Sequence, residues 1–327
     1  MIYILGFILC ALIIFFAGKK LSYYGDLLAE KTGLSKGWVG IVLMASVTSL
    51  PELMVGISSV TIVKSADLAV GDIIGSCAFN FGILAMLDAF TPKSKPIFGI
   101  ASQTHILNAG LGIILIGLVG IALFVPHQIA VTPWIALSSI LFIIVYFLSI
   151  RIIYYNEKNH PETLITHNTP KTHAPAKLIL KKYMILSLVI IVAALALPFF
   201  VDNIAQTWGL NSSFVGTFFL AASTSLPEIA VSVAAVRIGS IDLAVGNLLG
   251  SNIFNILILA LDDVFYSNGL LLQDASSSHL ISILSTIMMA AIVIIGLSYH
   301  AKGKKFFLAW DAILIFAIYV LNLLLLL

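Results

Sequence analysis

The chain has 327 residues, of which 60% are hydrophobic and 10% are charged, and its formal net charge is +2. Soluble domains carry roughly 25% charged residues, so this composition excludes a protein whose whole surface faces water. The mean hydropathy of +1.10 predicts a polytopic membrane protein.

Apolar segments recur along the whole chain at lengths near the ~20 residues that cross a bilayer as a helix. We predict ten spans, at approximately residues 2–18, 37–63, 67–91, 103–125, 131–153, 183–201, 212–236, 242–266, 278–299 and 306–327. The segments do not alternate apolar and polar residues, as the strands of a membrane β-barrel do. The expected fold class is therefore an all-α polytopic membrane protein.

The basic residues are distributed unevenly between the two sides of the predicted membrane. All of them except Lys64 fall in the odd-numbered connections between spans. Short cytoplasmic loops carry an excess of lysine and arginine, so we place the odd connections in the cytoplasm and both termini outside. We expect the plasma (inner) membrane as the location.

A polar stretch rich in proline, threonine, histidine and lysine divides the chain at residues 154–182 and predicts a cytoplasmic linker. The regions before and after it, 1–153 and 183–327, each contain five predicted spans. Because five is odd, the second region enters the membrane from the opposite side. Inverted repeats of this kind are typical of secondary transporters, whose binding sites lie at the repeat interface near the midplane.

Two similar motif regions, at 45–90 and 221–265, support the repeat. TSLPE at Thr48 recurs at Thr224, and GSCAFN at Gly75 matches GSNIFN at Gly250. We expect four glycines of these regions to allow close contact between helices: Gly71, Gly75, Gly246 and Gly250.

A proline in each TSLPE motif predicts a broken helix in the second and seventh spans. Pro51 has no N–H group, so the carbonyl of Val47 loses its helical partner, and Pro227 does the same to Ser223. Irregular backbone within a membrane survives where it is buried or lines a wet cavity. Freed carbonyls in a cavity are good ligands for a hard cation.

Glu52 and Glu228 stand next to these prolines. An ionised side chain at mid-bilayer costs at least ~2.5 kcal/mol, and the motif-bearing spans contain no basic residue that would compensate it. The missing positive charge is most simply a bound ion. Carboxylates with hydroxyl, amide and backbone oxygens approach the roughly 6–8 oxygen ligands of Ca²⁺.

The paired segments resemble the α-repeats of the cation/Ca²⁺ exchanger superfamily, most closely its sodium/calcium exchanger branch in microbial form. The resemblance implies a ten-helix antiporter in which inward Na⁺ movement drives Ca²⁺ outward. It implies ion ligands at Glu52, Thr48, Ser49, Ser76 and Asn80, at Glu228, Thr224, Ser225, Ser251 and Asn255, and at the carbonyls of Ala45 and Ala221. Beyond the transported Na⁺ and Ca²⁺ and the lipid bilayer, we expect no cofactor, enzymatic activity, nucleic acid or obligatory protein partner.

The sequence departs from the family pattern at several positions. The family's Gly-Asn pair reads Gly71-Asp72 in the first copy, and its Asn after Gly-Ser is Cys77. Asp72 either adds a third carboxylate to the site or lies at the outer interface. Potassium-dependent relatives carry Asp where this chain has Asn255, which weighs against K⁺ co-transport. A Ca²⁺/H⁺ antiporter, a K⁺-dependent exchanger and a cation channel remain alternative interpretations.

Overall fold

The computed structural model describes residues 2–32, 34–125, 129–159, 174–208, 221–299, 303–304 and 307–326. Its long helices are α1 (Ile2–Thr32), α5 (Ala66–Leu87), α7 (Thr104–Phe124), α8 (Leu137–Asn159), α9 (Ala176–Trp208), α13 (Ile241–Phe265), α15 (His279–Tyr299) and α16 (Trp310–Leu326). Short helices connect or interrupt them: α2 (Lys36–Trp38), α3 (Ala45–Thr48), α4 (Leu50–Ser58), α6 (Ile97–Ile100), α11 (Ala221–Thr224), α12 (Leu226–Arg237) and α14 (Leu271–Asp274). Wider π-helical turns form Val39–Met44 and Ser59–Val63, and a 3₁₀ turn forms Asp88–Phe90.

Several of these segments are long and apolar enough to cross a membrane. Within the described residues there are seven, namely Ile2–Thr32, Lys36–Val63, Ala66–Phe90, Thr104–Phe124, Leu137–Lys158, Ile241–Phe265 and His279–Tyr299. The apolar helix α16 is shorter, and α9 overlaps the sixth predicted span. Residues 160–173 of the predicted linker and 212–220 of the predicted seventh span lie outside the described residues.

Two predicted boundaries differ from the structure. Helix α1 continues to Thr32, well past residue 18, where the first span was predicted to end. The polar residues that follow the apolar run continue the same helix. Helix α8, which corresponds to the fifth predicted span, begins at Leu137 rather than at 131. The preceding residues form an antiparallel hairpin of β1 (Ala130–Thr132) and β2 (Ile135–Ala136), so the chain is not entirely helical. Pro133 in the intervening turn suits this hairpin because its φ is fixed and it has no N–H to pair.

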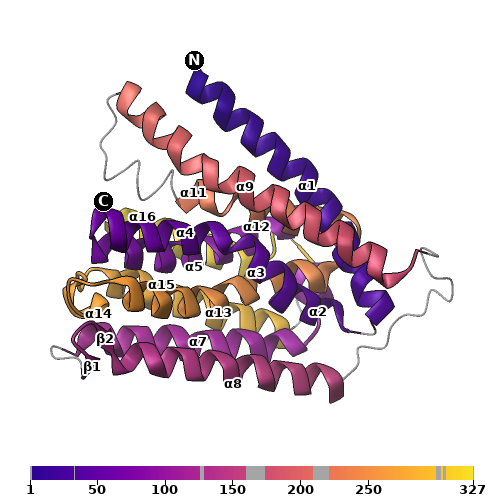
Figure 1. Ribbon diagram of the computed structural model, residues 1–327. Coiled ribbons are helices and arrows are strands. Elements are labelled where there is room, and N and C mark those ends of the chain that lie inside the picture. The colour runs from indigo at the N-terminus through magenta and orange to yellow at the C-terminus, as the bar shows by residue number, and fades with distance from the viewer. Residues whose placement is uncertain are drawn as a thin grey trace.

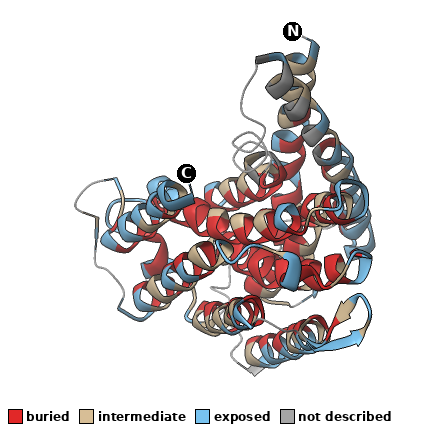
Figure 2. Cartoon of the chain, turned by 90° about the vertical axis from the view of Figure 1, so that its left-hand side faces the viewer, coloured by how far each residue is buried: buried red, intermediate tan, exposed pale blue. Residues whose placement is uncertain are grey.

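The helices form a layered bundle (Figure 1). Helices α1 and α9 lie side by side and cross obliquely over the rest, whereas α7 and α8 form the opposite layer. Helix α13 lies between them, with 89% of its most apolar 18-residue window buried, against 22% for α1. Figure 2 shows the buried residues gathered in the middle of the bundle and the exposed residues on its outer faces. Many exposed side chains are large and apolar, as expected of a surface that faces lipid.

Close backbone contacts hold α13 against the start of the second span. A Cβ at Gly246 would lie 2.7 Å from the carbonyl oxygen of Gly37, and one at Gly250 would collide with the backbone of Ile41. The expected role of these two glycines in close helix contact agrees with this geometry. Gly71 instead faces the His279 side chain, and a Cβ at Gly75 would meet no neighbour within 4 Å.

Two aspartates at matching positions of the motif regions anchor the connections that follow them. Asp88 accepts hydrogen bonds from the N–H groups of Ile97 (2.8 Å) and Ala309 (2.7 Å). Asp263 accepts them from Leu271 and Ala136, both at 2.9 Å. Each carboxylate therefore satisfies backbone donors at the start of a short helix and of a more distant segment.

A second matched pair of contacts closes the two ends of the bundle. Asp242 accepts from the N–H of Ser102 (2.7 Å) and lies 3.1 Å from Nε2 of His105. Asp67 accepts from Ser276 (2.6 Å) and lies 3.2 Å from Nε2 of His279. The His105 side chain is fully buried, whereas that of His279 keeps some exposure.

Candidate functional site

Two interrupted helices carry the candidate site. A single serine stands between α3 and α4, and another between α11 and α12. Ser49 has φ −89° and ψ 6°, and Ser225 has φ −82° and ψ 6°, so both interruptions have the same backbone geometry. Pro51 and Pro227 occupy the first turns of α4 and α12, where a missing N–H costs no helical hydrogen bond.

The two glutamates follow in the same first turns and are almost completely buried, each at 1% exposure. The exposed N–H groups of a helix start favour negative charge there. The hydroxyl of Ser49 donates to Oε1 of Glu228, and that of Ser225 donates to Oε1 of Glu52, both at 3.3 Å. The two carboxylates are thus held crosswise, each by the serine of the other motif.

Several oxygen atoms of the predicted site residues are buried without any hydrogen-bond partner among the described residues. They are Oε2 of Glu52, Oε2 of Glu228, Oγ of Ser76, Oδ1 of Asn80 and Oδ1 of Asn255. Buried polar atoms nearly always have a partner, and each exception calls for an explanation such as a bound ion. The unpartnered oxygens of Glu52 and Asn80 have matching unpartnered oxygens on Glu228 and Asn255. Both motif regions therefore contribute unpaired oxygen atoms.

Hydrogen bonds between α5 and α13 orient the two amides. Nδ2 of Asn80 donates to Oδ1 of Asn252 at 3.0 Å, and Nδ2 of Asn255 lies 3.7 Å from Sγ of Cys77. The amide nitrogens are therefore engaged, whereas the amide oxygens of Asn80 and Asn255 remain available to a cation.

The hydroxyls on the other side of the site form a connected group. Ser251 donates to Oε1 of Glu228 at 3.5 Å and lies 3.5 Å from the hydroxyl of Thr48. Thr48 also donates to Oδ1 of Asn247 at 3.3 Å. These contacts join the second span directly to α13 and α12.

The other predicted ligands are the Ala45 carbonyl, Thr224 and the Ala221 carbonyl. The Ala45 carbonyl already accepts from the N–H of Ser49 (3.0 Å) and the hydroxyl of Thr48 (3.3 Å). Thr224 is buried at the end of α11, and Ala221 begins that helix. A carbonyl has two lone pairs, and the Ala45 oxygen already accepts two hydrogen bonds.

Three buried polar residues were not predicted for the site, namely Asn247, Asn252 and Asp262. Asn247 and Asn252 occupy the repeat positions of Asp72 and Cys77, and this correspondence was the signal that could have identified them. Asp72 itself is 8% exposed, so its side chain lies inside the bundle. Asp262 gave no signal because its repeat counterpart is Leu87.

The chemistry of this group of residues suits a hard cation. Carboxylate, hydroxyl and amide oxygens are the ligands of Na⁺ and Ca²⁺ in proteins. Within the described part of the chain, no ion pair involves Glu52 or Glu228, and no three His, Cys, Asp or Glu side chains form a metal cluster. Two buried carboxylates without a basic partner can be neutralised by a bound cation or by protons.

Comparisons with known proteins agree with this chemistry. The sequence model of the family described as sodium/calcium exchanger protein matches residues 2–155 and 183–327. The putative antiporter CaxA of Alkalimonas amylolytica is 29% identical over 91% of this chain and 90% of its own length. The sodium/calcium exchanger MaX1 of Methanosarcina acetivorans is 34% identical over 42% of this chain and 38% of its own length. The solved structure of the sodium-calcium exchanger NCX_Mj shares the fold, with a TM-score of 0.76, 21% identity and coverage of 99% of this chain and 98% of that one.

Proposed function

The chain belongs to the sodium/calcium exchanger family of integral membrane antiporters, which are not enzymes, and from this we propose that it exchanges Na⁺ for Ca²⁺ by alternating access. The observation that carries the proposal is the group of buried, unpartnered oxygen atoms around Glu52 and Glu228. The name of the relative from Methanosarcina acetivorans supports the choice of Na⁺ and Ca²⁺ as the exchanged ions.

The proposed architecture has ten spans in two inverted five-helix repeats, at 1–153 and 183–327, with a cytoplasmic linker at 154–182. The second and seventh spans are broken at their prolines. Asp88 and Asp263 make matching hydrogen bonds to backbone N–H groups, and so do Asp67 and Asp242. These two matched pairs support the repeat. The distribution of basic residues supports a cytoplasmic linker and outside termini in the plasma (inner) membrane.

The proposed ion site has one set of ligands from each repeat. The carboxylates supply the charge, and the neutral oxygens complete the coordination. The full set is Glu52, Thr48, Ser49, Ser76, Asn80 and the Ala45 carbonyl with Glu228, Thr224, Ser225, Ser251, Asn255 and the Ala221 carbonyl. The unpartnered atoms on Glu52, Glu228, Ser76, Asn80 and Asn255 support this assignment.

Competition for the two carboxylates explains exchange. A Ca²⁺ ion or several Na⁺ ions can offset their charge, but the shared ligands cannot hold both at once. The loaded protein then changes between inward-open and outward-open states, whereas the empty site carries uncompensated charge within the membrane and resists the change. Coupling follows because only an occupied site crosses readily.

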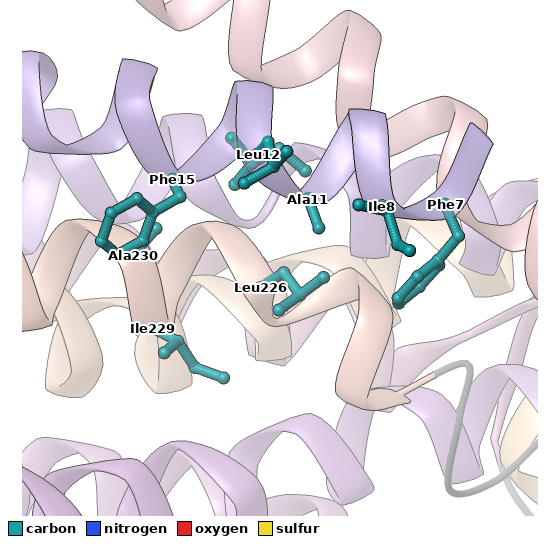
Figure 3. A pocket seen from close by; sticks show the side chains of 9 residues that line it. Phe7, Ile8, Ala11, Leu12, Phe15, Leu226, Ile229 and Ala230 are labelled. Carbon is teal, nitrogen blue, oxygen red and sulfur yellow. The ribbon is translucent and has the colours of Figure 1, made fainter. Parts of the chain in front are cut away.

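Helices α1 and α9 are the proposed moving element. An apolar cleft of 310 Å³ lies between α1 and α12, and Figure 3 shows side chains of both helices pointing into it. Its lining consists of Phe7, Ile8, Ala11, Leu12, Ile14, Phe15, Leu226, Ile229 and Ala230. These apolar side chains form no hydrogen bonds, so α1 can slide past α12, which carries Glu228, without breaking a hydrogen bond in the cleft. Farther along α1, Ser22 donates to the carbonyl of Val231 at 2.7 Å and limits the movement.

Na⁺-gradient-driven uptake of radiolabelled Ca²⁺ into proteoliposomes tests the function. Glu52→Gln and Glu228→Gln should each abolish uptake, because either change removes half of the charge at the site. Glu157→Gln is the matched control: Glu157 is also buried with both carboxylate oxygens unpartnered, but it lies against Gly37 near the end of α8. Full activity of either Glu52→Gln or Glu228→Gln protein would refute the site.

The same vesicles separate the alternative interpretations. Ca²⁺ flux that follows a pH gradient without Na⁺ would identify a Ca²⁺/H⁺ antiporter, an alternative favoured by the additional buried carboxylate of Asp72. A requirement for K⁺ together with Na⁺ would identify a K⁺-dependent exchanger. Conductance without any counter-ion would identify a channel.

A further inference from the structure

Two buried aspartates beyond the proposed ion site have no function in it. Asp72 on α5 is 8% exposed and Asp262 on α13 is 0% exposed. None of their four carboxylate oxygens has a hydrogen-bond partner among the described residues. Unpaired carboxylates in a protein interior are costly, so their charge must be neutralised by a bound cation or by protons.

The two aspartates lie in line with Glu52. A side chain at Gly56, one turn after Glu52 on α4, would collide with the carboxylate of Asp262. Asp72 is one turn before Ser76 on α5. The contacts of Asn80 with Asn252 and of Cys77 with Asn255 show that α5 and α13 run antiparallel. Asp72, nearer the start of α5, therefore lies level with the end of α13 that carries Asp262. The three carboxylates therefore form a row from the middle of the bundle towards the end where α5 begins and α13 finishes, the end marked by α14 in Figure 1.

The symmetry-related side of the bundle has no such row. The repeat positions that match Asp72, Asp262 and Gly56 are occupied by Asn247, Leu87 and Ser232. Nδ2 of Asn247 donates to the hydroxyl of Ser232 at 3.0 Å, so that position is closed by a neutral hydrogen bond. The repeat fold thus forms without these carboxylates, and a purely structural role does not explain why one side carries two of them.

Mutual repulsion strengthens the case for a ligand. Two like charges that share a buried space destabilise the protein unless a cation or protons separate them. We infer that Asp72 and Asp262 form a second cation site, which binds Ca²⁺ one helical turn from Glu52. An ion that enters from that side of the membrane binds there before it reaches the central site. The inference deepens the proposed function, and in the proposed orientation this side is the outer one.

Equilibrium binding of radiolabelled Ca²⁺ to purified protein tests the second site without transport. The Glu52→Gln/Glu228→Gln protein, which lacks the central carboxylates, should still bind Ca²⁺. Adding Asp72→Asn and Asp262→Leu, each the residue found at the matching repeat position, should abolish that remaining binding. Absence of Ca²⁺ binding in the first protein, or equal binding in both, would overturn the inference. This result does not depend on whether the wild-type protein exchanges Na⁺ for Ca²⁺.

Exchange measured from each face provides the second test. In right-side-out vesicles, Asp72→Asn/Asp262→Leu should raise the half-saturating Ca²⁺ concentration about tenfold, since removing nearby charge weakens the attraction of the cation. In inverted vesicles the value should stay unchanged. Glu157→Gln, at the opposite end of the bundle, should change neither. Equal effects from both faces, or a shift in pH dependence with unchanged Ca²⁺ saturation, would show that the pair is not a Ca²⁺ site.

A folding control accompanies both measurements. The variants should keep the thermal unfolding temperature of the wild type or exceed it, because they remove uncompensated buried charge. If Asp262→Leu unfolds the protein, Asp262→Asn replaces it, with the same expected loss of binding.

Discussion

The hydroxyl oxygen of Ser225 lies 3.3 Å from Oε1 of Glu52, although 173 positions separate the two residues in the chain. Ser49 and Glu228, 179 positions apart, repeat this contact at the same distance. Each serine holds one oxygen of the opposite glutamate and leaves Oε2 unpartnered. The two motifs therefore depend on each other for the orientation of their carboxylates.

Removing either serine hydroxyl should weaken cation binding to a similar extent. A hydrogen bond to a charged group contributes about 1.5–3 kcal/mol, so Ser49→Ala and Ser225→Ala should each raise the half-saturating Ca²⁺ concentration of exchange about tenfold or more. Ser46→Ala is the control, because the Ser46 hydroxyl donates to the carbonyl of Val42, four residues earlier in the same span, and not to the site. An unchanged Ca²⁺ dependence in either site variant would contradict the crosswise arrangement.

Lys304 and Asp88 form a buried ion pair that should contribute strongly to stability. Nζ of Lys304 lies 3.1 Å from Oδ1 of Asp88, and the two side chains are 1% and 0% exposed. Removing one partner of a buried pair costs about 3–5 kcal/mol, because the remaining charge is left uncompensated. Lys304→Met should therefore lower the thermal unfolding temperature in detergent clearly, whereas Lys95→Met, at an exposed position, should not. Similar unfolding temperatures for the two variants would show that the pair is not needed.

The two histidine–aspartate contacts should differ in strength despite their matching geometry. The His105 side chain is 0% exposed and its partner Asp242 19%, against 15% and 55% for His279 and Asp67. Losing a buried partner costs about 1–3 kcal/mol, whereas an exposed pair contributes about 0–1 kcal/mol. His105→Ala should therefore reduce the unfolding temperature more than His279→Ala does. The reverse order would mean that burial does not control these contacts.

Alanine should be tolerated at one glycine of α5 and not at the matching glycine of α13. A Cβ at Gly250 would collide with the backbone of Ile41, whereas one at Gly75 meets nothing within 4 Å. Gly250→Ala should force the helices apart and reduce the yield of folded protein. Gly75→Ala should leave stability unchanged or raise it by about 0.5–1 kcal/mol through helix propensity. Size-exclusion profiles and thermal unfolding measure both, and equal behaviour would contradict the packing of α13.

Much of the helical framework could be predicted from hydropathy. The predicted spans 67–91 and 242–266 agree within one residue with Ala66–Phe90 and Ile241–Phe265. Polar residues bound these runs sharply, so composition and helix ends coincide. At Lys19 they do not coincide: the apolar run stops, but the helical hydrogen bonds of α1 continue to Thr32. Hydropathy predicts which residues can lie in lipid, but a helix can continue beyond them.

The sequence by itself determined the class of protein, its family resemblance and the two glutamates, because an acidic residue repeated beside a proline within an apolar run has few other physical explanations. The tertiary structure decided which groups meet: Ser225 with Glu52, Asn252 with Asn80, and Asp262 with Gly56. These contacts depend on the packing of helices that are far apart in the chain. Spacing along one helix specifies which residues share a face, but only the approach of another helix specifies what that face contacts.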